Sequence, residues 1–254
     1  MSECFDTISE AVLYDIFNAN CIEDIEMYKT ICADIDQVLE LGIGTGRLAV
    51  PLAQTGVHVV GIDNSPQMLS ALDSKIKAEK VDGISYYEQD MRSLSIKSMF
   101  DLVLCPFCTF NFLQSIDDQE KALLSIRKLL TDGSKIVFDL LTVNTFGNSI
   151  QDGSLKHYDS YVCPDEDATI EIYTSNKFNQ CSQILMQQRV FRKYIHGIMV
   201  GERHTVMQNR LFFLGEFQLL LDKCGLKIIN TYGNYRFSQF SQHSQNLLVV
   251  ATLK

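Results

Sequence analysis

A glycine-rich loop constrains this chain more than any other segment. The sequence ELGIGTG at 40–46 closes a short apolar run at 37–41 and precedes a helical pattern over 47–54. Glycines between a buried strand and a helix let the backbone turn sharply and let a ligand approach without a Cβ in the way. In the dinucleotide fingerprint G-x-G-x-x-G the last two glycines are three positions apart, whereas Gly44 and Gly46 are two apart. The acid at Glu40 disfavours a diphosphate and suits a ligand that carries positive charge.

Strand and helix patterns alternate along most of the chain. Apolar runs that predict strands recur between helical patterns at 66–80 and 117–130, and Ser65 and Pro66 form a helix start signal. The seven predicted strands are 37–41, 57–62, 84–88, 100–104, 134–141, 226–231 and 247–252. This alternation predicts an α/β fold with a Rossmann-like, doubly wound, mostly parallel seven-stranded sheet.

The pattern changes near residue 150. Over 156–212 the residues alternate with period two, with turns expected at Asn179-Gln180 and His196-Gly197, so we expect an antiparallel β insertion along one edge of the sheet and over the carboxyl ends of its strands. Residues 8–33 have helical periodicity. The predicted organisation is an N-terminal helical lid at 1–35, a ligand-binding core at 36–150, an acceptor-binding β insertion at 151–212, and the last part of the core at 213–254.

Acids follow the next two predicted strands of the core. Asp63 ends the second strand, where a carboxylate can accept hydrogen bonds from both hydroxyls of a ribose. Asp90 follows the third strand and is placed to accept from the exocyclic amine of an adenine, with Met91 beside it. Met68 is placed to pack on the adenine face. A nucleoside ligand is therefore expected at this edge of the sheet.

These segments resemble the successive motifs of class I methyltransferases that use S-adenosylmethionine (SAM). The resemblance is carried by VLELGIGTGR at 38–47, GIDNSPQML at 61–69 and QDMR at 89–92. Later segments resemble a bacterial small-molecule subgroup that includes sugar N-methyltransferases and, more distantly, glycine N-methyltransferase. They are DLVLCPF at 101–107, GEFQLLL at 215–221, and YGNY at 232–235 followed by Ser244.

The resemblance assigns roles to single residues. It implies that Glu40, Gly42, Gly44 and Gly46 face the methionine part of SAM, that Asp63 with Asn64 binds the ribose, and that Asp90, Met91 and Met68 bind the adenine. Cys105 would supply backbone near the amino group. Tyr14 resembles the N-terminal tyrosine that closes over SAM in the sugar enzymes. The subgroup often has Asn, His and Asp where Cys108, Phe112 and Asn234 stand here, which indicates a different acceptor or geometry.

Composition narrows the partners. The chain of 254 residues has a net charge of −9 and no Lys/Arg-rich stripe, which argues against a nucleic-acid substrate. No apolar run approaches the length of a membrane span. Eight cysteines without framework spacing indicate free thiols and a cytoplasmic location. No metal site is expected, and a homodimer is compatible with the sequence.

The expected reaction is in-line transfer of a methyl group from SAM to an N or O atom of a small-molecule acceptor, leaving S-adenosylhomocysteine. Tyr14, His157 and His196 are the candidate catalytic residues, although a lone histidine is more often a surface or packing residue. A non-catalytic SAM sensor or partner subunit, and an NAD-dependent oxidoreductase, are the alternatives. The C-x-x-C at Cys105 and Cys108 resembles a redox motif but follows the fourth strand rather than the first.

Overall fold

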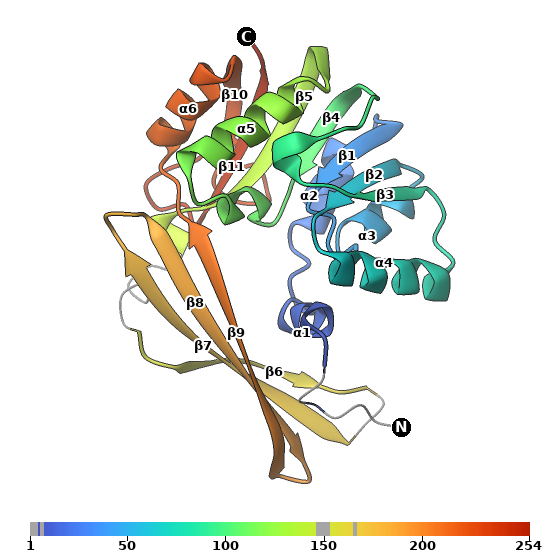
Figure 1. Ribbon diagram of the computed structural model, residues 1–254, viewed down its shortest axis with the longest axis vertical. Coiled ribbons are helices and arrows are strands. Elements are labelled where there is room, and N and C mark those ends of the chain that lie inside the picture. Colours follow the sequence, from blue (N-terminus) through green and yellow to red (C-terminus); the bar gives the residue numbers. More distant parts are fainter. Residues whose placement is uncertain (1–4, 6–7, 146–152, 165–166) are drawn as a thin grey trace.

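A seven-stranded sheet forms the centre of the upper part of the molecule (Figure 1). The computed structural model describes residues 5, 8–145, 153–164 and 167–254. The strand order is β10-β11-β5-β4-β1-β2-β3, in which β1 pairs in parallel with β2 and β4, and β11 pairs antiparallel with β5 and β10. The bounds are β1 (Gln37–Leu41), β2 (His58–Asp63), β3 (Ile84–Glu88), β4 (Phe100–Cys105), β5 (Leu130–Leu141), β10 (Leu226–Tyr232) and β11 (Asn246–Leu253). The predicted Rossmann-like α/β fold is confirmed.

Helices cover both faces of this sheet because its strands alternate buried side chains between the two sides. Leu39 packs in the cluster that includes α5 and α6, whereas its neighbour Val38 packs in the cluster that includes α2, α3 and α4. The helix bounds are α2 (Ile25–Ile31), α3 (Ala49–Ala53), α4 (Pro66–Glu79), α5 (Ile116–Arg127) and α6 (Leu214–Lys223). The predicted start of α4 is confirmed, since the Ser65 side chain caps it and Pro66 is its first residue.

The helical pattern at 8–33 is two helices rather than one. α1 (Glu10–Phe17) ends at Asn18, whose side-chain amide donates to the Tyr14 carbonyl over 2.8 Å. The chain then turns before α2, and Arg47 Nη1 donates to the Cys21 carbonyl in this turn over 2.7 Å. The helical periodicity of the apolar residues continues across this break, so the sequence pattern could not reveal where one helix ends and the next begins.

The period-two segment forms a second, four-stranded antiparallel sheet with the order β6-β7-β8-β9. Its strands are β6 (Lys156–Val162), β7 (Ala168–Asn179), β8 (Ile184–Ile195) and β9 (Ile198–Arg210). We expected a meander added to one edge of the main sheet, but none of these described strands pairs with it. The insertion lies beyond the carboxyl ends of the parallel strands, where we also expected it (Figure 1). The predicted limits at residues 1, 150 and 151 fall outside the described residues.

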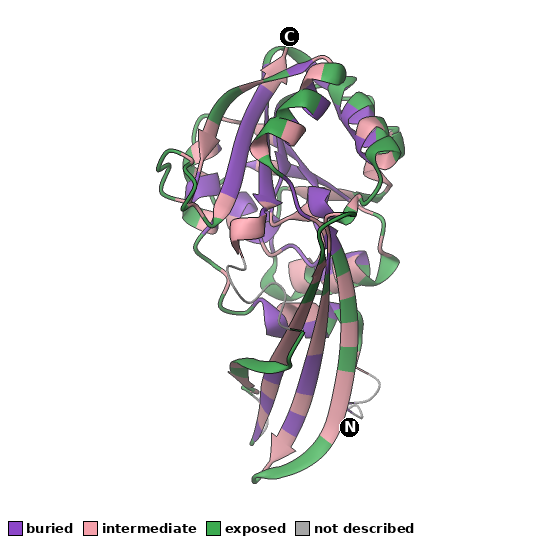
Figure 2. Ribbon diagram, turned by 90° about the vertical axis from the view of Figure 1, so that its left-hand side faces the viewer, coloured by how far each residue is buried: buried purple, intermediate pink, exposed green. Residues whose placement is uncertain are grey.

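α1 lies between the two sheets (Figure 1). Its apolar side chains Leu13, Ile16 and Phe17 form one buried cluster with Ile170, Ile172 and Phe191 of the antiparallel sheet. Figure 2 shows buried segments on the middle strands of that sheet, with mostly intermediate and exposed residues on its outer strands. α1 therefore packs on the insertion while it also reaches the loop after β1.

Candidate cofactor site

The three glycines of the loop after β1 have left-handed backbone conformations. Their φ angles are +72° at Gly42, +55° at Gly44 and +82° at Gly46. A Cβ on Gly42 would lie 2.4 Å from Thr109 Cγ2, and one on Gly46 would lie 2.5 Å from Leu72 Cδ1. A Cβ on Gly44 would meet only the Gly42 carbonyl oxygen at 3.9 Å. Gly44 is therefore the point at which the loop leaves room for a ligand.

Asp63 connects the end of β2 to this loop. Its Oδ2 accepts from the Gly44 amide over 2.9 Å, and its Oδ1 accepts from the Ser65 amide over 2.9 Å. Burial raises the pKa of Asp63, and these backbone donors oppose the rise. Carboxylate oxygens can accept further hydrogen bonds. Asn64 beside Asp63 is exposed and Met68 is half-buried in the first turn of α4, so all three predicted residues follow β2 at the same edge.

Glu40 lies in β1 just before the loop and is buried. Its Oε2 atom has no hydrogen-bond partner, and burial raises the pKa of its carboxyl to about 8, against the opposing effect of the Arg47 charge. A buried carboxylate oxygen without a partner is costly, so it favours a ligand that brings a donor and positive charge. The amino group of SAM has this chemistry. The residues present therefore fit the methionine end of SAM.

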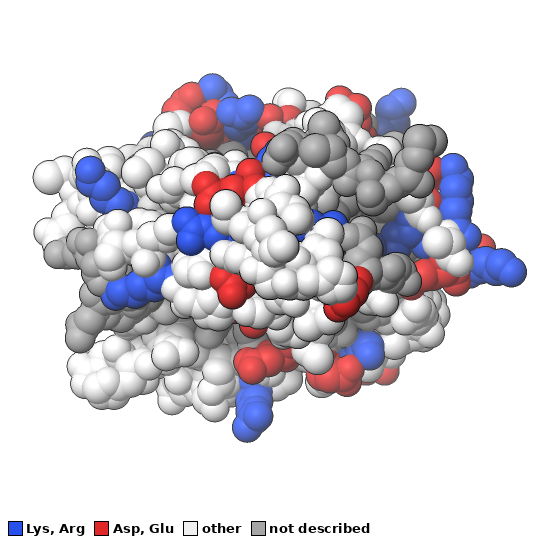
Figure 3. Space-filling view, turned by 90° about the horizontal axis from the view of Figure 1, so that it is seen from below, with Lys and Arg blue, Asp and Glu red and all other residues white. Residues whose placement is uncertain are grey.

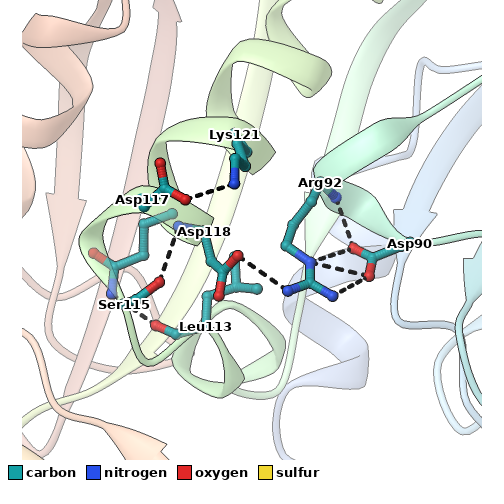
Figure 4. A network of polar contacts seen from close by, with 8 residues as sticks. Asp90, Arg92, Leu113, Ser115, Asp117, Asp118 and Lys121 are labelled. Atoms are coloured by element: carbon teal, nitrogen blue, oxygen red, sulfur yellow. Dashed lines mark hydrogen bonds and ion pairs between the residues drawn. The ribbon is translucent and has the colours of Figure 1, made fainter.

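Asp90 is held by a neighbouring cation (Figure 4). Arg92 Nη2 lies 2.6 Å from Asp90 Oδ2, and Arg92 Nη1 lies 3.0 Å from Asp118 Oδ1 at the start of α5. The hydrogen bonds from Arg92 lower the pKa of Asp90. Asp90 also caps the short helix η2 (Met91–Ser93), and Met91 packs against the core. The sequence QDMR contained this local partner, which the sequence-based interpretation did not use.

The segment after β4 forms the lip of the site. Cys105 ends β4, and the next residues Phe107 and Cys108 have φ angles of +48° and +63°, which are strained for side chains with a Cβ. Burial raises the pKa of both Cys105 and Cys108 well above that of an ordinary thiol. Both cysteines are free, and a redox role would need a reactive thiolate. These raised pKa values argue against the redox alternative.

Asp139 of β5 lies behind this lip and was missed by sequence reasoning. Its Oδ2 accepts from the Tyr235 hydroxyl over 3.0 Å and from the Phe107 amide over 3.3 Å, whereas its buried Oδ1 has no partner. Burial raises the pKa of Asp139 to about 7. Asn246 donates to the Tyr235 oxygen over 3.0 Å. The one sequence signal for Asp139 was an acidic residue inside the apolar run that forms β5, where a buried carboxyl group points to a special role.

Arg47 joins the N-terminal segment to the site, and it also received no role from the sequence. Its Nη1 and Nη2 atoms lie 2.8 Å and 2.6 Å from the two carboxylate oxygens of Asp24. The guanidinium lies 3.9 Å from the ring centre of Phe107. The Arg47 side chain is 13% exposed and that of Asp24 only 3%. This partly buried, bidentate pair fixes the turn between α1 and α2 against the lip.

Tyr14 on α1 is brought to the same region. Burial raises its pKa to about 12, while the nearby Arg47 charge opposes the rise and the charges of Asp15 and Glu40 add to it. Asp15 Oδ1 accepts from the Thr45 hydroxyl in the glycine loop over 2.5 Å, and Asp15 Oδ2 lies 3.2 Å from Lys75 Nζ of α4. α1 is therefore fastened directly to the loop.

The two histidines lie in the antiparallel sheet. His157 is exposed in β6 and hydrogen-bonds Ser160 over 3.1 Å. His196 is in the turn after β8, 73% exposed, with Nδ1 3.1 Å from Asp167. The other end of β8 packs near the core through Leu185, and a strand of this length spans roughly 35–40 Å. The described contacts of the two histidines do not connect them to the glycine loop.

Comparison with known proteins supports the fold and relates part of the chain to methyltransferases. Residues 38–133 match the model of a family described as a methyltransferase domain. A putative methyltransferase of Geobacillus sp. (strain WCH70) is 30% identical over 149 residues, which are 58% of this chain and 59% of that protein. The chain thus spans less than two thirds of this relative. The cypemycin N-terminal methyltransferase of a Streptomyces species is 26% identical over 217 residues, or 84% of this chain and 81% of that protein.

Solved structures are similar over nearly the whole chain. A SAM-dependent methyltransferase from Clostridium acetobutylicum has a TM-score of 0.79 at 19% identity, and the match covers 96% of this chain and 97% of that one. A SAM-bound amino pentose methyltransferase from Micromonospora echinaspora, involved in calicheamicin biosynthesis, has a TM-score of 0.69 at 20% identity and coverage of 94% and 91%. These likenesses show that the chain has the fold of SAM-dependent methyltransferases, and the glycine loop, Glu40 and Asp63 described above have the chemistry to hold SAM. The family match covers residues 38–133, less than half of the chain, and over these residues the chain resembles the methyltransferases.

Proposed function

We propose that the chain transfers the methyl group of SAM to an amine nitrogen of a small-molecule acceptor. The observation that carries the cofactor half of this proposal is the unpartnered, buried Glu40 oxygen beside the open face of Gly44. The relatives named above support the acceptor half, because they include an N-terminal methyltransferase and an amino pentose methyltransferase. Both of those acceptor classes can present an amine.

The residues of this chain bind and align rather than react covalently. When bound, SAM supplies an activated methyl group on a sulfonium that leaves as a neutral thioether. Glu40 would neutralise the cationic end, Asp63 would hold the ribose while it fixes the Gly44 amide, and Met68 would lie by the adenine. Alignment of the nucleophile with the methyl–sulfur bond is the main contribution that such an enzyme makes to the rate.

Asp139 is the residue that we propose takes the proton from the acceptor amine. A carboxyl whose pKa is about 7 is matched to a proton acceptor at neutral pH. It lies directly behind the lip through its contact with the Phe107 amide, and its Oδ1 has no partner. A hydroxyl acceptor is much less acidic than an ammonium, so this carboxylate suits an amine better.

We also propose where the chain acts and which class of acceptor it uses. We infer a cytoplasmic enzyme, since Cys21, Cys32, Cys105, Cys108, Cys181 and Cys224 are free thiols. None of the helices in the described part of the chain has the length and apolar character of a membrane span. On the face seen in Figure 3, acidic and basic side chains are interspersed, which supports a small molecule over a nucleic acid.

Calorimetry and product analysis test the proposal. We expect S-adenosylhomocysteine to bind the purified chain and NAD not to bind. We expect S-adenosylhomocysteine to form when SAM is mixed with a panel of amino sugars and short peptides, and not with matched hydroxyl analogues. Cofactor binding without product from any amine would support the non-catalytic sensor. Binding of NAD in place of the cofactor would support the oxidoreductase.

A further inference from the structure

Arg189 of β8 is a cation in the antiparallel sheet that forms no ion pair with any carboxylate of the described residues. It is partly buried, and among the described residues its guanidinium bonds only the neutral side chain of Gln187, with Nε 2.7 Å from Gln187 Oε1. Arg192 on the same strand, by contrast, has a carboxylate partner, and its Nε lies 2.6 Å from Glu202 Oε2. A partly buried guanidinium keeps five donors, and here most of them have no acceptor from the described protein.

Aromatic rings fix the position of this cation. The guanidinium carbon lies 3.6 Å from the centre of the Phe17 ring of α1. Tyr158 of β6 stacks on the same ring, with centroids 4.8 Å apart and an angle of 4° between the planes. Stacking on a ring leaves the edge donors of a guanidinium in its own plane, where they can engage a planar anion.

Arg189 lies on the side of the sheet that faces the cofactor loop. Its neighbour on that face of β8, Phe191, packs against α1, whereas Arg192 points to the other face. The charge of Arg189 acts on Tyr14 and Cys21, and Cys21 also feels Arg47. Tyr14 and the turn at Cys21 thus lie near both arginines, Arg47 at the lip and Arg189 on the insertion.

The neighbouring acids are already engaged. Asp24 is paired with Arg47, Asp15 with Thr45 and Lys75, and Asp159 accepts from Asn20 over 3.0 Å. Because Arg189 is partly buried without such a partner, its pKa is lowered to about 10, and it still carries its proton at neutral pH. An anionic group of a ligand that pairs with Arg189 would offset the free-energy cost of keeping this charge partly buried without a partner.

Resting on the methyltransferase function proposed above, we infer that Arg189 binds an anionic group of the acceptor, a carboxylate or a phosphate. The acceptor is then a small molecule with an amine at one end, held near the lip, and an anion at the other, held by the insertion. A bidentate guanidinium–anion pair gives orientation as well as affinity.

Anion binding tests this inference directly. The chain is saturated with S-adenosylhomocysteine and titrated by calorimetry with inorganic phosphate, and separately with acetate, at constant ionic strength set by chloride. We expect the wild type to bind one of the two with a millimolar dissociation constant, and the anion that binds identifies the source. Arg189→Met keeps an apolar stem over Phe17 and should weaken binding at least about tenfold. Arg189→Lys keeps the positive charge but loses the planar guanidinium, so its anion affinity should lie between those of the wild type and Arg189→Met.

The matched control is Arg192→Met, which removes a cation from the same strand on its other face and should leave anion binding unchanged. A second measurement uses only the wild type, so it does not depend on the folding of a variant. Phenylglyoxal labels accessible arginines, and mass spectrometry maps the labelled sites. Phosphate or acetate should protect Arg189 and not Arg192 from labelling. Binding that survives in Arg189→Met, equal loss in Arg192→Met, or neither anion bound by the wild type would overturn the inference. Failure of S-adenosylhomocysteine to bind would instead refute the proposed function.

Discussion

The Gly44 amide donates to Asp63 Oδ2 over 2.9 Å, so the residue expected to hold the ribose also holds the loop that faces the methionine end. Two parts of the cofactor site are therefore coupled through one carboxylate. The second oxygen of that carboxylate fixes Ser65 at the start of α4. Loss of this side chain should disturb both the loop and the helix.

We predict that Asp63→Ala weakens SAM binding by about tenfold or more, because hydrogen bonds to a charged acceptor contribute on the order of 1.5–3 kcal/mol. Calorimetry measures the change. Asp73→Ala is the control, since the Asp73 carboxylate bonds Lys77 and Tyr86 away from the loop. Unchanged SAM affinity in Asp63→Ala would remove this residue from the site.

Glu40 is expected to show a conflict between stability and binding. Its folded-state pKa of about 8 lies above the ordinary value of 4.5 for a glutamate side chain. The folded chain therefore holds a proton that the unfolded chain releases, and stability falls as the pH rises from the lower value to the higher. Glu40→Gln should raise the melting temperature above pH 8, by about 2–4 °C for each kcal/mol regained.

The same variant should lose the cofactor. In the wild type SAM affinity should increase as the pH rises through about 8, because the charged carboxylate becomes available. Glu40→Gln should bind weakly at every pH. Glu26→Gln, which alters an 80% exposed carboxylate paired with Lys29, should change neither property. A destabilised Glu40→Gln with normal SAM affinity would contradict both arguments.

The pair Asp24–Arg47 should be coupled in stability. Arg47→Met leaves a carboxylate that is 3% exposed without its partner, which costs about 3–5 kcal/mol. Asp24→Asn together with Arg47→Met should recover a large part of that loss, because no buried charge remains. Urea denaturation of the wild type, both single variants and the double variant measures the coupling. Additive losses would show that the two side chains act independently.

The framework of the fold followed from local patterns, since each strand and helix repeats its buried positions within a few residues. The loop, Glu40 and Asp63 were found because parallel strands end at one edge, which makes acids at strand ends neighbours. Asp139 and Tyr235 are 96 residues apart, and only the completed sheet brings them together. The face of β8 that carries Arg189 could not be told from alternation alone, because both faces of that strand carry cations and apolar residues.

Asp139 should set the acidic limb of the rate profile. Burial raises the pKa of its carboxyl from the ordinary value of 3.8 to about 7, so the form that accepts a proton accumulates above pH 7. With an amine acceptor, kcat should rise with pH through about 7 and then level off. Asp139→Asn should remove this limb and lower kcat by about 10²–10⁴. If the limb persists in that variant while SAM binding is normal, another group takes the proton.

Tyr14 should act as part of a lid that shields the cofactor. A reactive sulfonium must be kept from water, and mobile segments at strand ends commonly do this. α1 packs on the insertion through Leu13 and Phe17, and Asp15 binds Thr45 of the glycine loop, so the helix touches both parts of the site. Tyr14→Phe should therefore reduce turnover or SAM affinity while the melting temperature barely moves. Tyr87→Phe, at an exposed ring in β3, is the matched control.

Hydrogen exchange across 8–20 should slow when S-adenosylhomocysteine is added, because the closed helix is held by the ligand. If exchange there ignores the cofactor and Tyr14→Phe keeps full activity, Tyr14 is a packing residue and α1 is a fixed part of the wall.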